Sequence, residues 1–198
     1  MFSTILSISA LLASFAILCV GHGLQNTLLG VRATLEHYPE WVTGVMMSGY
    51  FLGFLFGTSL CSRLVPVVGQ IRTFAAFASV ASAISLLHAL FVNEITWVLL
   101  RFVYGVCIAG LYMVIESWLN ALSTKQNRGQ VLSVYMVLSF LGLALGQLLV
   151  FVAEPSDYRL FAIVSICESF ALVPLTLSKA KQPEALPSEH FSLKRLYH

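Results

Sequence analysis

Several charged and polar residues stand inside long apolar stretches of this sequence, where they could bind a solute or carry a proton. Five residues of the fourth such stretch recur with the period of a helix: Arg101, Gly105, Ile108, Tyr112 and Glu116. At about 100° per residue they fall on one face. A single helix would therefore present a guanidinium group, a phenol and a carboxylate to the same surroundings.

The two charges of this stripe stand too far apart to pair with each other. The helical rise from Arg101 to Glu116 is about 22 Å, so each charge needs a partner on another helix or water in a cavity. Arg101 either faces and fixes a wet cavity or fills a structural ionic or hydrogen-bonding role. Glu116, near one end of the stretch and close to Trp118, has either a structural or gating role or a role in binding substrate or protons.

A second polar group lies near the middle of the first apolar stretch. His22, Gln25 and Asn26 follow the i, i+3, i+4 spacing that places side chains on one helix face. Gly21 and Gly23 flank the histidine, so the helix could bend there. Two interpretations remain open: hydrogen bonds between helices, or a polar patch that faces a ligand.

Two further ionisable residues occur in the third and sixth apolar stretches. Glu168 stands about ten residues into the sixth stretch, where a lone carboxylate could act as a proton carrier. His88 lies near the end of the third stretch, and a structural role is the better interpretation there.

The composition indicates a membrane protein. Of 198 residues, 58% are hydrophobic and 10% are charged, whereas soluble proteins carry roughly 25% charged residues. A net charge of +2 is too small to indicate nucleic-acid binding. A helix needs about 20 apolar residues to cross the hydrocarbon core, and six stretches meet that length: residues 4–31, 41–62, 71–92, 95–119, 130–153 and 158–178. None alternates with period two, so the sequence predicts an all-α integral membrane protein with six transmembrane helices.

The sequence carries no signature of an enzyme or of a metal or cofactor site. It lacks a Gly-x-Ser-x-Gly elbow, a His-Glu-x-x-His motif and a phosphate-binding loop. Its four cysteines each lie alone in apolar sequence, which favours a packing role. We therefore expect a protein that is not an enzyme and needs no cofactor or metal.

Basic residues between the apolar stretches predict how the chain is oriented. Connections on one side hold most of them: Arg63, Arg72, Lys125, Arg128, Lys179, Lys181, Lys194 and Arg195. Connections on the other side hold Arg32 and Arg159. Because cytoplasmic loops are enriched in lysine and arginine, both termini are expected in the cytoplasm.

Glycines at four-residue spacing mark two helices for close packing. The second stretch carries Gly49, Gly53 and Gly57, and the fifth carries Gly142 and Gly146. Small residues at this spacing let helix backbones approach closely in a membrane. Plain structural contact and an interface that slides during a conformational cycle both remain open.

Several segments together resemble the Major Facilitator Superfamily, and the likeness covers essentially the whole chain. The segment 44–57 is similar to the second helix of that family, and 100–110 to its fourth-helix Arg-x3-Gly motif. Segments that resemble a bacterial branch of it, the YcaD-type transporters, are 116–120, 128–135, 142–147 and 192–197.

The resemblance implies a specific architecture. Full members have two six-helix halves around a site at the bilayer midplane. This chain is similar to the N-terminal half, itself two three-helix repeats. Residues 1–178 would form the transmembrane domain, and 179–198 would form a cytoplasmic tail like the central linker of a full-length transporter.

The resemblance also implies roles for individual residues. Helices 1 and 4 of each half line the central cavity, which places six residues on the substrate pathway: His22, Gln25, Asn26, Tyr50, Arg101 and Tyr112. The glycine faces of helices 2 and 5 would form the moving contact with the other half. Helices 3 and 6 would be peripheral, which argues against a central role for Glu168 and His88.

The expected function is secondary active transport of a small organic solute by alternating access, with or without proton coupling, in the bacterial inner membrane. Because six helices alone would expose polar faces to lipid, we expect a second copy or a separate C-terminal half as partner. The alternative is a truncated or regulatory membrane protein that binds a full transporter and transports nothing itself.

Overall fold

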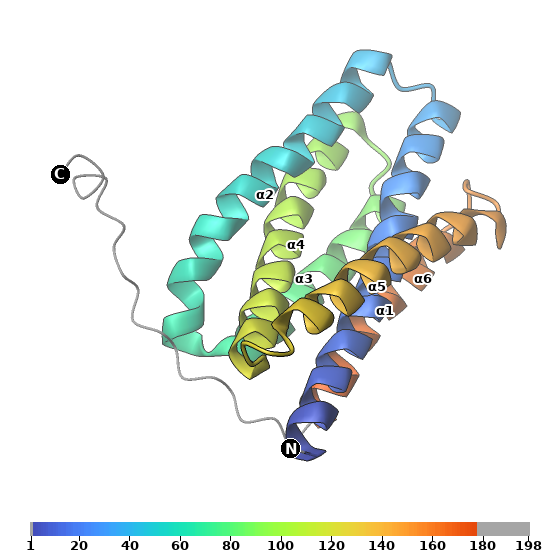
Figure 1. Cartoon of the computed structure of the whole chain (residues 1–198). Helices are drawn as coiled ribbons and strands as arrows, with labels where there is room; N and C mark the ends of the chain where they lie inside the picture. Colours follow the sequence, from blue (N-terminus) through green and yellow to red (C-terminus); the bar gives the residue numbers. More distant parts are fainter. Residues whose placement is uncertain (1, 178–198) are drawn as a thin grey trace.

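In a computed structural model, the chain forms one bundle of long helices (Figure 1). The structure describes residues 2–177, so the expected cytoplasmic tail lies outside the described residues. The elements are α1 (Phe2–Leu35), α2 (Glu40–Val68), α3 (Gln70–Leu90), α4 (Glu94–Leu122), α5 (Arg128–Leu148), the short 3-10 helix η1 (Leu149–Phe151), α6 (Arg159–Phe170) and α7 (Leu172–Leu177). Six segments are long and apolar enough to cross a membrane, with α6 and α7 together making the sixth. The described chain is therefore an all-α, six-span membrane domain.

Two helices run further than the sequence predicted, and local backbone geometry explains where they end. The first helix continues to Leu35, and the turn after it passes through His37, whose φ is 56°. The second helix continues past residue 62, the end of the predicted stretch, and through Pro66, because a proline in the last turn removes only one backbone hydrogen bond. Gly69, with φ of 90°, is the single residue between the end of α2 and the start of α3.

The six spans are arranged around α1 and α4. The helix α1 packs along α5 and α6, while α4 packs along α2 and α3, and α3 closes against α6. The helices α2 and α5, well separated in Figure 1, make almost no contact with each other in the described part of the chain. As a result, α1 and α4 are the most buried spans, and α2 and α5 the least.

The third helix is well buried among the other described helices. About half of its membrane span is buried, nearly as much as in α1. The cause is its place between α4 and α6, where His88 and Ser85 are completely buried. Residues of α3 can therefore contribute to the interior of the bundle.

Glycines set the close contacts within the bundle. A Cβ atom on Gly53 would overlap the carbonyl oxygen of Phe102 in α4, and one on Gly105 would overlap that of Tyr50 in α2. In the same way, a Cβ on Gly146 of α5 would overlap the backbone of α1. The expectation that these glycine faces meet a second half is therefore not met, because α4 and α1 already occupy them.

The opposite faces of α2 and α5 are apolar and exposed. They carry Val45, Phe51, Leu52, Leu55 and Phe56 on α2, and Val137, Phe140, Leu141, Leu145 and Leu148 on α5. Such a surface is unfavourable in water but suits lipid or another membrane helix.

These contacts predict unequal effects for two alanine substitutions on α2. Gly53→Ala should destabilise the folded protein by about 1–3 kcal/mol, because the added methyl group forces α2 away from α4. Gly44→Ala is the matched control, since a Cβ there meets no atom within 4 Å. Equilibrium unfolding in mixed detergent micelles measures both. Equal stabilities of the two variants would contradict the packing described here.

Candidate functional site

Arg101 is buried in the interior of the bundle, where it contacts residues of α1 and α2. It is 1% exposed, and its Nη2 donates to Asn26 Oδ1 at 3.0 Å and to Met47 Sδ at 3.6 Å. The guanidinium carbon lies 4.5 Å from the centre of the Tyr50 ring, within range of a cation–π contact. Its Nε and Nη1 atoms are buried without a hydrogen-bond partner among the described residues. The cation is therefore held in place with part of its donor capacity unused.

His22 links the contacts of Arg101 to Tyr104, a second residue of α4. Because Arg101 can only donate, Asn26 Oδ1 must face it, which turns Asn26 Nδ2 toward His22 Nε2 at 3.0 Å. Tyr50 Oη also lies 3.3 Å from His22 Nε2, and Tyr104 Oη lies 3.4 Å from Nδ1. In a neutral ring, Nε2 thus accepts and the proton sits on Nδ1, directed at Tyr104.

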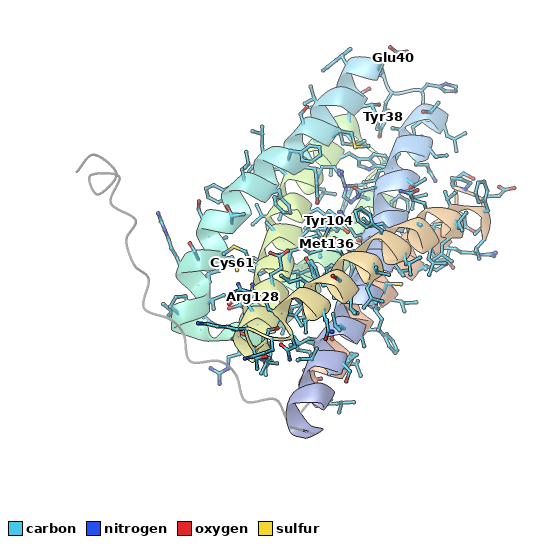
Figure 2. The ribbon with its side chains drawn as sticks, viewed as in Figure 1. Tyr38, Glu40, Cys61, Tyr104, Arg128 and Met136 are labelled. Carbon is cyan, nitrogen blue, oxygen red and sulfur yellow. The ribbon has the colours of Figure 1, made fainter. Side chains whose placement is uncertain are left out.

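The chain of hydrogen bonds ends at Glu168 on α6. Tyr104 Oη donates to Glu168 Oε1 at 2.7 Å, and Ser85 Oγ donates to Oε2 at 2.9 Å. Figure 2 labels Tyr104 in the interior of the bundle, where both it and Glu168 are completely buried. A continuous series of contacts therefore joins Arg101 to Glu168 through α1 and α4. We call the residues Arg101, Asn26, His22, Tyr50, Tyr104, Glu168 and Ser85 the polar cluster.

Gln25 contacts a different helix from its two predicted companions. It is completely buried, and its Nε2 lies 3.5 Å from His88 Nδ1 on α3. His88 Nδ1 also lies 2.8 Å from the carbonyl oxygen of Ile84. Adjacent helix positions are about 100° apart, so Gln25 points away from Asn26 and toward a different helix. Gln25 therefore contacts α3, whereas His22 and Asn26 contact α4.

The other two polar side chains of the predicted stripe, Tyr112 and Glu116, lie outside the polar cluster. Tyr112 Oη is 3.8 Å from Cys19 Sγ, and the Tyr112 ring centre is 6.1 Å from that of His22. Glu116 is exposed and accepts a hydrogen bond of 2.6 Å from Tyr135 on α5. Glu116 thus links α4 to α5 at a separate place on the bundle.

Sequence periodicity missed Tyr104 and gave Glu168 too little weight. Tyr104 stands three residues after Arg101, so helical spacing alone already placed a second phenol near the guanidinium. The sequence marks Glu168 as a possible proton carrier, while the family resemblance argues against a central role for it; in the structure it contacts both Tyr104 and Ser85. Only the packing of α3 and α6 against α4 brings these groups together.

Comparisons with known proteins agree with this architecture. A family model described as the Major Facilitator Superfamily matches residues 1–197. The chain is similar to an uncharacterized MFS-type transporter YcaD from Escherichia fergusonii, with 36% identity over 140 residues. The protein of the same name from Escherichia coli (strain K12 / DH10B) is 36% identical over 142 residues. Each match covers 71% of this chain and 37% of the relative, so this chain corresponds to only part of those proteins.

The contacts of Asn26 predict a measurable loss of stability when its side chain is removed. Asn26→Ala deprives Arg101 of its acceptor and His22 of a donor, which should cost about 1–3 kcal/mol of unfolding free energy. Thr34→Ala on the same helix is the control, because Thr34 is exposed and bonds only to Gly30 of its own helix. Unfolding in mixed micelles compares the two; an unaffected Asn26→Ala protein would mean that the contact is not formed.

Proposed function

The chain belongs to the Major Facilitator Superfamily, and from that premise we propose that it transports a small organic solute across a membrane by alternating access. The solute would bind at the Arg101 end of the polar cluster, beside His22, Asn26 and Tyr50. Gln25 and Tyr112, the remaining predicted pathway residues, would flank this site without touching the arginine.

The observation that carries this proposal is the unused donor capacity of Arg101. A buried N–H group without an acceptor is costly, and two nitrogen atoms of this guanidinium are in that position in the described structure. A carboxylate, or another strong acceptor on a solute, would satisfy them with charge-assisted hydrogen bonds. Arg101 is thus the proposed anchor for an anionic or dipolar group.

Alternating access requires a second body that moves against this bundle, so we propose that a second six-helix unit completes the transporter. It would be another copy of this chain or a C-terminal half. The low burial of α2 and α5 supports this arrangement, as does the greater length of the relatives. The second unit would meet the apolar outer faces of α2 and α5, since their glycine faces are occupied.

The distribution of basic residues supports a cytoplasmic location of both termini, with the bacterial inner membrane as the proposed site.

Exposed Glu116, bound to Tyr135 of α5, is the proposed gating contact. The alternative function, an interaction protein that binds a larger membrane protein without transport of its own, predicts binding but no uptake after reconstitution.

Ligand binding tests the role of Arg101. Thermal shift of the purified protein is measured with acetate, lactate and benzoate, and with the three corresponding amides, because a ligand of the folded state raises the melting temperature. We expect at least one of these compounds to bind and to be taken up by proteoliposomes. Arg101→Ala should weaken its binding about tenfold or more.

The control for this experiment is Arg159→Ala, which removes an exposed arginine whose one ion-pair partner among residues 2–177 is Asp157. It should bind as the unchanged protein does. If Arg101→Ala retained the same affinity and uptake, Arg101 would not be part of the transport site.

The mass of the protein in mild detergent tests the second unit. Native mass spectrometry should find the chain assembled with another copy of itself or with a further six-helix chain. A single six-helix chain that catalyses uptake in proteoliposomes would contradict the proposal. The outer faces of α2 and α5 would then be lipid-facing surfaces only.

A further inference from the structure

We propose that Glu168 binds one proton for each monovalent organic anion bound at Arg101, with Tyr104 and His22 as the relay between the two sites. The inference rests on the proposed transport function and adds its coupling ion and the charge of its solute. Four consecutive contacts carry it: Arg101 to Asn26, Asn26 to His22, His22 to Tyr104, and Tyr104 to Glu168.

The groups that surround Glu168 are thiols and hydroxyl groups, and no described residue forms an ion pair with it. The ion pairs in the described part of the chain are Arg32–Glu36 and Arg159–Asp157, and neither includes Glu168. The ionisable groups that face Glu168 are Tyr104 and Cys107 on α4, its neighbour Cys167, and His22 on α1 through Tyr104. On α3 it meets Ser85, while His88 one turn away turns to Ile84 and Gln25; α7 carries no ionisable residue.

Charge balance links Glu168 to the solute. Separated charges in a low-dielectric interior are costly, and the cluster is least costly when its charges sum to zero. Without solute, the cation of Arg101 is balanced by an ionised Glu168. With a monovalent anion on Arg101, the sum returns to zero only when Glu168 takes up a proton. Anion and proton therefore favour each other's binding.

The relay can move that proton without any displacement of the backbone. A proton that arrives at His22 Nε2 makes the ring an imidazolium. The Nδ1–H bond then breaks as that proton passes to Tyr104 Oη, while the Tyr104 O–H bond breaks and its proton passes to Glu168 Oε1. Tyr104 and His22 end neutral and Glu168 ends as the acid, so protons and charge balance.

The transfer also changes the Arg101 end of the cluster. After it, His22 carries its proton on Nε2, which no longer accepts from Asn26 Nδ2. Asn26 restores a hydrogen bond by turning its Oδ1 to His22, which takes away the acceptor of Arg101 Nη2. A further guanidinium donor is then free for an anion. Protonation of Glu168 thereby prepares the solute site.

Infrared spectroscopy without any solute tests this proposal. The probe is the pH of the buffer, and the readout is the C=O stretching band of a buried protonated carboxyl group. The purified protein should show such a band at acidic pH that disappears reversibly at alkaline pH. Glu168→Gln, an isosteric change, should remove it, whereas Glu116→Gln should retain it. A band that survives in Glu168→Gln overturns the proposal.

Two further variants test the coupling and the relay. In Arg101→Gln, Glu168 should stay protonated and its band should persist to a proton concentration roughly tenfold lower than in the unchanged protein, because the balancing cation is gone. An unchanged titration overturns the coupling. Tyr104→Phe should shift the band, because Oε1–H loses its acceptor. The control Tyr38→Phe removes a hydroxyl that has no hydrogen-bond partner in the part of the chain that the structure describes, and it should leave the band in place. An unshifted band in Tyr104→Phe overturns the relay.

These results are independent of the transport assay. If Glu168 titrates as described but no solute is taken up, the proposed transport function fails and the proton site stands. If uptake depends on Arg101 while Glu168 shows no titration, the proton site fails and the transport function stands. Gel filtration of each variant shows that it is folded before its spectrum is compared.

Discussion

A cation inside a membrane protein has to find acceptors within the protein, and the placement of Arg101 shows how this bundle meets that requirement. Water is absent from the hydrocarbon region, so Arg101 turns inward to Asn26 and to the face of the Tyr50 ring. The same contact orients the Asn26 amide, which in turn sets the tautomer of His22. The directions of the hydrogen bonds from Asn26 to His22 and from His22 to Tyr104 follow from this first one.

Backbone packing determines whether these groups can reach one another. Gly105 stands one turn after Arg101 and lies directly against the backbone of Tyr50. A larger residue there would push α2 away and carry the Tyr50 ring off the guanidinium. Gly23, beside His22, plays the same part between α1 and the backbone of Leu143. Close helix contacts without side chains thus hold the polar groups at hydrogen-bonding distance.

The sequence predicted the six spans and drew attention to Arg101, His22 and Asn26, because hydropathy and helical period depend only on neighbours along the chain. It did not predict the Gln25–His88 contact or the link from Tyr104 to Glu168. Helical period shows which residues share a face, but the helix that covers that face is a matter of tertiary packing. Pro66 illustrates the same limit on a smaller scale, since its effect depends on its place in the last turn of α2.

The polar cluster joins the two three-helix repeats. Three of its hydrogen bonds cross from α1–α3 to α4–α6: those of Arg101 with Asn26, of His22 with Tyr104, and of Ser85 with Glu168. A second contact between the repeats, that of Ser82 with Ser165 and Ser169, contains only hydroxyl and backbone groups and so does not change with charge. Under the proposed coupling, a proton or an anion in the polar cluster would therefore alter these three hydrogen bonds and leave the serine contact unchanged.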